Sequence, residues 1–215
     1  MKIGIIGSGI VGQVLARSLN SEGHSVMLGT RDTTKPEVVE FAAKNPFITT
    51  GTFEEAAIFG ELLVLATAGT AVENAIALAG PLHFSAKTVI DTTNPISGAE
   101  PVNGVLGYFT KADESLMERI QKLIPDARVV KAFNSVGNAF MYKPQFEGGP
   151  PTMFICGNNE AAKKTVTEIL TAFGWETEDM GKIEAARAIE PLCILWCIPG
   201  FIRNEWSHAF KLLKK

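Results

Sequence analysis

The chain has 215 residues, 46% of them hydrophobic, so it can bury a substantial core in one large domain or in one domain with a small appendage. Its 20 basic and 23 acidic residues give a net charge of −3, which provides no electrostatic basis for binding nucleic acid. Three cysteines are too few for a disulfide framework and are typical of a reducing compartment. We therefore expect a cytoplasmic protein.

The N-terminal stretch joins a predicted strand to a predicted helix through a glycine-rich turn. Residues 2–6 form a short apolar run, and residues 11–22 carry apolar side chains at helical spacing. Between them, residues 7–12 match the pattern Gly-x-Gly-x-x-Gly, in which the glycines permit a tight turn, the approach of a pyrophosphate and close helix packing. With the phosphates on the helix N-terminus, the predicted cofactor-binding residues are Gly7, Ser8, Gly9, Ile10 and Val11.

The second predicted strand, residues 25–28, leads into the loop where a dinucleotide is selected. An enzyme that prefers NAD usually holds the ribose hydroxyls with an acidic side chain at the end of this strand. Asp32 lies at about the expected distance from the glycines, but Thr30 and Arg31 are nearer the strand end. A hydroxyl, a guanidinium and the ammonium of Lys35 suit a 2′-phosphate, because hydrogen bonds between charged groups are strong. We predict NADP(H) as the cofactor, bound here by Thr30, Arg31 and Lys35.

The middle of the chain alternates predicted helices with short apolar strands. We expect helices at 36–44, from a capping box at Thr52 to about residue 60, and up to residue 79, with strands at 47–50, 62–66 and 88–91. Residues 62–66 are apolar throughout, as in a strand buried on both faces of a parallel sheet. This alternation predicts an α/β fold with a doubly wound parallel sheet of the Rossmann type, in which ligands bind beyond the carboxyl ends of the strands.

Small and polar residues follow two of these strands where a nicotinamide is expected. The first group is Ala66, Thr67 and Ala68, and the second is the turn at residues 92–95, with Asn94 as a hydrogen-bonding group. Asn134, after a later strand, is a second amide that would orient the carboxamide or an acceptor ring. We include all five residues in the predicted cofactor site.

The second half continues with a helix capped by Asp113 that runs to residue 124 and strands at 128–133 and 152–156. A helix at 159–173 and an edge strand at 176–180 follow, and from Ile183 the chain is predicted to be helical, with a break at Pro199-Gly200. We therefore expect a dinucleotide-binding Rossmann domain of residues 1–182 and a short helical C-terminal extension, residues 183–215, packed on it.

The extension is unusually apolar. Residues 188–202 contain Glu190, Pro191 and Pro199 and number fewer than the ~20 needed to span a bilayer, so no membrane contact is expected. Part of this surface must pack on the sheet. The remainder would form a homodimer interface or the wall of a pocket for a flat aromatic ring.

No side chain is predicted to be catalytic and no metal site is predicted. The three histidines, His24, His83 and His208, are scattered and have no evident relay partner. Lys131 and Asn134 have the spacing of a dehydrogenase pair, but Lys131 lies in a strand, where residues three apart do not share a face. Cys193 and Cys197 lie on one helical face without a nearby histidine, which indicates core packing.

Several segments together resemble the NADP-dependent oxidoreductases that exchange hydride with the deazaflavin coenzyme F-420. These are the glycine turn, residues 29–31 with Lys35, 130–136, 156–158, 179–181 and 185–192. The motifs Lys131-Ala-Phe-Asn134 and Ala186-Arg-Ala-Ile-Glu190 look closer to the cytoplasmic domain of the STEAP-type ferric reductases. The resemblance covers nearly the whole chain and implies NADP(H) with deazaflavin, FAD or FMN as second substrate. It implies no membrane metal reduction, because the chain stops where the membrane domain of those reductases begins.

Three functions remain in competition. The first is hydride transfer between NADP(H) and a flavin or deazaflavin, which needs no proton-transfer residue because the cofactors carry the chemistry. The second is an NADP-dependent reductase of a small carbonyl or imine, which the missing acid or base disfavours. The third is a non-catalytic NADP-sensing protein.

Overall fold

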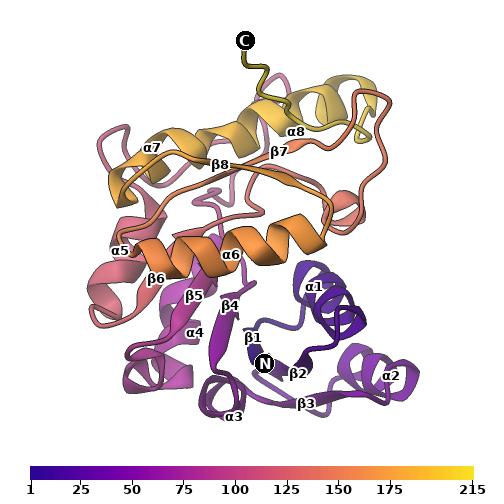
Figure 1. Ribbon diagram of the computed structural model, residues 1–215, viewed down its shortest axis with the longest axis vertical. Helices are drawn as coiled ribbons and strands as arrows, with labels where there is room; N and C mark the ends of the chain where they lie inside the picture. The colour runs from indigo at the N-terminus through magenta and orange to yellow at the C-terminus, as the bar shows by residue number, and fades with distance from the viewer.

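The computed structural model describes residues 1–215, and its first six strands form one parallel sheet (Figure 1). The spatial order β3-β2-β1-β4-β5-β6 is that of a doubly wound Rossmann fold, which confirms the predicted fold class. The order reverses between β1 and β4, so the carboxyl ends of these two strands mark the expected ligand crevice. The strands are β1 (Lys2–Ile6), β2 (Ser25–Thr30), β3 (Ile48–Thr52), β4 (Leu62–Leu65), β5 (Thr88–Asp91) and β6 (Arg128–Lys131).

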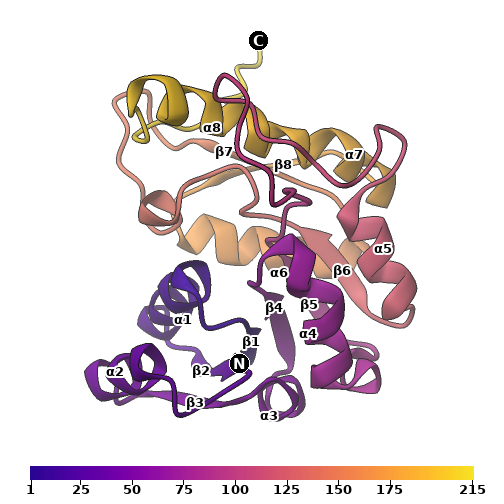
Figure 2. The same ribbon diagram turned by 180° about the vertical axis from the view of Figure 1, so that it is seen from behind.

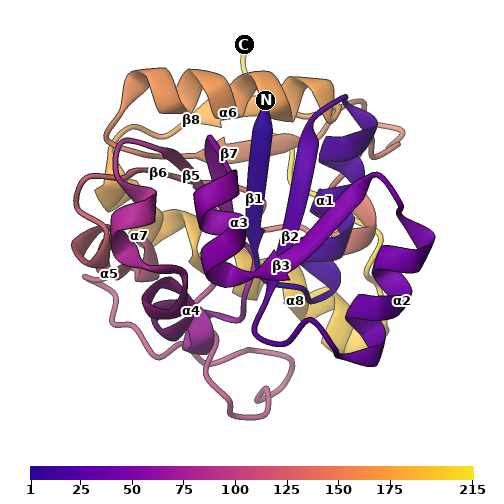
Figure 3. The same cartoon turned by 90° about the horizontal axis from the view of Figure 1, so that it is seen from below.

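Helices cover both faces of this sheet and bury two separate apolar cores. One core lies under α1 (Ile10–Ser21), α2 (Pro36–Lys44) and α6 (Glu160–Ala172). The other lies under α3 (Phe53–Phe59), α4 (Val72–Ala79) and α5 (Leu116–Leu123). Figure 2 shows α1 and α4 on opposite sides of the sheet, and Figure 3 shows β1, β2 and β3 side by side, with α3 next to β1.

The two later strands do not extend the main sheet as the sequence predicted. β7 (Thr152–Ile155) and β8 (Glu176–Asp179) form a separate parallel pair, joined to β6 only by an antiparallel bridge between Lys131 and Cys156. Phe133 adopts a left-handed φ of 61°, which ends β6 earlier than predicted and turns the chain away.

The C-terminal helical run differs from the prediction in two ways: it continues through Pro199-Gly200, and it ends at Arg203, although the extension was predicted to be helical to residue 215. A 3₁₀ turn at Ile183–Ala185, α7 (Ala186–Ile189) and α8 (Pro191–Arg203) follow one another without interruption, so the expected break at Pro199-Gly200 is wrong. Pro199 removes only its own N–H donor, and the helix ends instead at Asn204, whose φ is 55°. Gly200 serves packing, because a Cβ there would lie 2.3 Å from the ring of Trp206. Residues 204–215 are not helical.

This run is long and apolar enough to cross a membrane by length and composition alone. It spans residues 183–203, 21 residues, with a mean hydropathy of 1.5 over its most apolar window, of which 39% is buried inside the protein. The shorter stretch predicted from the sequence therefore underestimates it. Its Glu190 side chain is buried against β6 and α5, which ties the run to the folded domain.

The start of α5 also differs from the prediction. Ser115, not Asp113, caps the helix: its Oγ accepts from the Glu118 N–H (3.2 Å), and the Glu118 carboxylate accepts from the Ser115 N–H (2.9 Å). Only Ser115 has a glutamate three residues later, as a capping box requires. Glu118 also pairs with Arg187 of α7, and this hydrogen bond lowers the pKa of Glu118 to about 2.

We expect Ser115→Ala to destabilise the protein by about 1 kcal/mol, because the N–H of Glu118 loses its acceptor. The midpoint of urea unfolding measures this change. Ser85→Ala is the control, since no hydrogen bond of the Ser85 side chain is present in the structure. Equal midpoints for the two variants would show that this cap is not stabilising.

Candidate functional site

The three glycines of the turn serve three different purposes. Gly7 has a φ of 133°, and a Cβ there would lie 2.4 Å from the carbonyl oxygen of Ala66 at the end of β4. A Cβ at Gly12 would lie 1.9 Å from the Gly7 carbonyl oxygen, so this glycine lets α1 pack on the turn. A Cβ at Gly9 would meet nothing within 4 Å. Gly9 therefore leaves open space at the beginning of α1.

The N-terminus of α1 is free to receive an anion. Gly9 is its N-cap, and no side chain accepts a hydrogen bond there. The first N–H groups of a helix lack partners within the helix, and the helix dipole makes this end positive. The Gln13 amide braces the turn by donating to the Ser8 carbonyl oxygen (3.1 Å). A pyrophosphate fits this position.

A cavity of about 420 Å³ lies beside the turn. Every predicted site residue except Val11, Asn94 and Asn134 lines this cavity. Sequence reasoning missed Gln13, which also lines it and which no motif marks in advance. The predicted residues that the structure brings together here are Gly7, Ser8, Gly9, Ile10, Thr30, Arg31, Lys35, Ala66, Thr67 and Ala68.

The charges at this cavity favour a phosphate over a ribose diol. Two cations, Arg31 and Lys35, and one carboxylate, Glu37, line it, and none of the three forms an ion pair within the protein, so the cations are in excess. The Asp32 carboxylate turns instead to Thr34, accepting from its N–H (2.9 Å) and hydroxyl (2.6 Å), which lowers the pKa of Asp32. Thr30 is buried and accepts from the Ser8 hydroxyl (3.0 Å), so it joins the end of β2 to the glycine turn.

A second cavity, of about 520 Å³, lies across the ends of β4 and β5. It shares Gly9, Ile10 and Ala66 to Ala68 with the first cavity and adds Val11, Thr92, Thr93 and Asn94. Ile96, Ser97 and Gly98 form its outer wall and were not predicted. None of its lining residues has an ionisable side chain.

Asn134 does not line either cavity, so its predicted direct contact with a cofactor is corrected. It is 3% exposed, and its amide donates to the Ile189 carbonyl oxygen (2.9 Å). The backbone carbonyl oxygen of Asn134 accepts from the side-chain amide of Asn94 (2.8 Å). Asn134 thus fixes the side chain of Asn94, and Asn94 in turn lines the second cavity.

The histidines lie elsewhere. His208 stacks on Trp196, His83 is 3.5 Å from Glu54, and His24 is 3.5 Å from the N-terminal amine. None of them lines either of the two cavities.

The comparisons with known proteins agree with this geometry. Residues 2–95 match the family model described as NADP oxidoreductase, coenzyme F420-dependent. A solved structure from Arthrobacter sp. FB24, described as a candidate F420-dependent NADP reductase, is 30% identical, has a TM-score of 0.93, and each chain covers 100% of the other.

Two curated relatives extend the comparison. The F420-dependent NADP reductase of Methanocaldococcus jannaschii is 25% identical in an alignment of 206 residues. The match covers 89% of this chain and 89% of that protein. Metalloreductase STEAP3 of Rattus norvegicus is 30% identical over 94% of this chain, but the match spans only 39% of that protein.

We expect Gly9→Val to fold normally and to lose dinucleotide binding, because its side chain would occupy the open space where the pyrophosphate is expected. Circular dichroism tests the fold and titration calorimetry with NADPH tests binding. Gly148→Val is the matched control, since a Cβ at Gly148 also meets nothing within 4 Å but lies outside both cavities. If Gly9→Val still bound NADPH, the pyrophosphate would not lie beside Gly9.

Proposed function

The chain belongs to the family of F420-dependent NADP oxidoreductases, and from this premise we propose that it transfers hydride between NADP(H) and a flavin or deazaflavin acceptor. NADP(H), when bound, exchanges the hydride at its nicotinamide ring. The chain's own residues bind and orient the two partners.

In this proposal the dinucleotide spans both cavities. Arg31 and Lys35 hold the 2′-phosphate, and Gly9 with the N-terminus of α1 holds the pyrophosphate. The nicotinamide lies beyond β4, beside Ala66 to Ala68 and Asn94. The shared lining residues support this path, because they connect the two cavities without a break.

The observation that carries the choice of acceptor is the uncharged second cavity. Reduction of a carbonyl or an imine places a proton on the reacting heteroatom, and enzymes usually supply it from a positioned acid. No Asp, Glu, His, Lys, Tyr or Cys lines the second cavity. Hydride transfer between two rings needs alignment of the nicotinamide carbon with the accepting ring atom, which is a nitrogen in a flavin and a carbon in a deazaflavin. The proton that completes reduction of the acceptor is taken from water at a second ring nitrogen.

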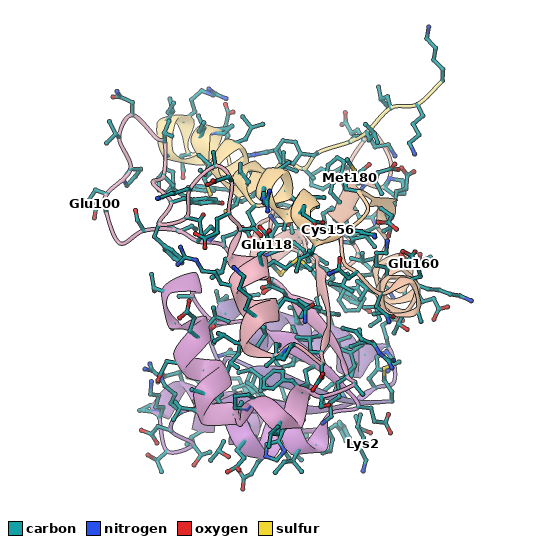
Figure 4. All side chains as sticks on the ribbon, turned by 90° about the vertical axis from the view of Figure 1, so that its left-hand side faces the viewer. Lys2, Glu100, Glu118, Cys156, Glu160 and Met180 are labelled. Carbon is teal, nitrogen blue, oxygen red and sulfur yellow. The ribbon has the colours of Figure 1, made fainter.

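The predicted homodimer is also part of this proposal. Leu195, Phe201 and Ile202 of α8 are 46–56% exposed, and the neighbouring loop exposes Val102 by 72%. Figure 4 shows this loop, with Glu100, projecting beside the C-terminal helices. Such apolar surface is typical of an interface.

An acceptor assay tests the reaction. We expect the protein to oxidise NADPH with coenzyme F-420, FMN or FAD, and to leave a cyclic imine unreduced. Ala68→Leu should remove most turnover by obstructing ring stacking, whereas Ala161→Leu, on the exposed side of α6, should not. Turnover of the imine alone would favour the small-substrate reductase, and NADPH binding without any turnover would favour a sensor.

We expect Arg31→Ala to weaken NADP(H) binding by ~10- to 150-fold, the equivalent of ~1.5–3 kcal/mol for a hydrogen bond to a charged group. Binding of NAD(H), which lacks the 2′-phosphate, should barely change. Titration calorimetry with both cofactors measures this, with Arg203→Ala as a control remote from both cavities. If Arg31→Ala weakened the binding of NADP(H) and NAD(H) equally, Arg31 would not bind the 2′-phosphate.

A further inference from the structure

A buried ionic cluster lies behind the wall of the second cavity. The Lys131 Nζ is 2.6 Å from the Asp91 carboxylate and 2.9 Å from the Glu190 carboxylate, and it donates to the Thr93 carbonyl oxygen (2.8 Å). Asp91 and Lys131 are aligned on the adjacent strands β5 and β6, and Glu190 joins from the C-terminal helical run. The side chains of Lys131 and Asp91 are 0% exposed.

The cluster holds two carboxylates against one ammonium, and α5 balances the difference. The Glu190 carboxylate accepts from the N–H groups of Leu116 (2.9 Å) and Met117 (3.0 Å), at the positive end of that helix. Burial disfavours the charged form of Lys131, but the two carboxylates outweigh it, so the pKa of Lys131 is raised. Lys131 is therefore held as an ammonium that gives up its proton less readily than an ordinary lysine does.

Stability alone is a weak reason for such a cluster, because apolar residues of similar size often stabilise a core at least as well as a buried ion pair. The cluster also has a local effect, since it binds all three polar groups of Thr93. The Asp91 carboxylate accepts from the Thr93 N–H (2.9 Å) and hydroxyl (2.7 Å). The Lys131 ammonium donates to the Thr93 backbone carbonyl oxygen.

The next residue, Asn94, is held just as firmly. The side-chain amide of Asn94 donates to the backbone carbonyl oxygen of Asn134. The side-chain amide of Asn134 in turn donates to the backbone carbonyl oxygen of Ile189. On the other side a Cβ at Gly69 would lie 1.9 Å from the Asn94 carbonyl oxygen, so the loop cannot shift toward β4. Thr93 and Asn94 both line the second cavity, and both are tied to the start of α8.

We propose that Lys131 is a positioning residue: with Asp91 and Glu190 it fixes the Thr93–Asn94 wall and thereby the orientation of the nicotinamide. This rests on the proposed function in one respect, which is that the nicotinamide occupies the second cavity. Lys131 itself touches neither cofactor nor acceptor, because it is buried behind the wall.

The test compares Lys131→Met with the double variant Lys131→Met/Glu190→Gln. The single change leaves two carboxylates without their ammonium and so endangers folding. The double change removes one positive and one negative charge, so only the Asp91 carboxylate loses its ammonium, and it keeps the Thr93 N–H and hydroxyl as donors. The amide oxygen of the new side chain would still offer an acceptor to α5, and circular dichroism checks that the double variant is folded. The control is Lys163→Met. Lys163 is 5% exposed and also pairs with two carboxylates, Glu160 and Asp179, although these are solvent-exposed, and it lies outside both cavities.

We expect the double variant to bind NADPH about as tightly as the wild type, because the phosphate contacts of the first cavity are unchanged. Its kcat should fall by ~10- to 100-fold, as for a misplacement on the order of 1 Å. Hydride transfer from NADPH deuterated on one or the other face of the nicotinamide should lose its facial preference, which a merely destabilised fold would not cause. Lys163→Met should retain wild-type kcat and preference.

The fluorescence of bound NADPH separates this proposal from the proposed function. It reports the surroundings of the nicotinamide without any acceptor, and it should change in the double variant and not in Lys163→Met. If the wild type turns over no flavin or deazaflavin, the proposed function fails while the fluorescence still tests Lys131. A double variant with wild-type fluorescence, kcat and facial preference, or one that has lost NADPH binding, would contradict the positioning role.

Discussion

The ammonium group of Lys131 lies inside the protein, where it must be surrounded by acceptors because removing a charge from water costs several kcal/mol. Its acceptors come from β5, from the loop after β5 and from the C-terminal helical run. Glu190 also caps α5. These elements are far apart in the sequence, so this buried charge ties the C-terminal helical run to the sheet and to the loop after β5.

The charges of the molecule follow the proposed path of the dinucleotide. Unpaired cations lie at the outer end of the first cavity, on Arg31 and Lys35. The second cavity is lined only by uncharged side chains, and the Lys131 ammonium is buried behind Thr93. This arrangement concentrates electrostatic attraction on the phosphates and leaves the reacting rings in neutral surroundings, where shape controls the reaction.

Most features that depend on short sequence patterns were predictable, although the capping box at Ser115 was missed, and those that depend on distant contacts were not. The glycine turn, the capping box at Thr52 and the six parallel strands follow from short patterns. Asn134 was misplaced because its partners, Asn94 and Ile189, come from elements distant in the sequence. The Lys131 cluster was missed for the same reason, although opposite charges at the ends of two apolar strands, Asp91 and Lys131, were a visible signal. Trp206 folding over Gly200 likewise required the tertiary structure.

Part of the non-helical tail, residues 210–212, lies beside Thr152, the first residue of β7. The Thr152 N–H donates to the Phe210 carbonyl oxygen (2.8 Å), and the Leu212 N–H donates to the Thr152 hydroxyl (3.0 Å). A two-stranded sheet with an open edge is a template on which strands of other molecules can add. The tail covers that edge at Thr152, so a chain that ends before Phe210 would expose it to strands of other molecules.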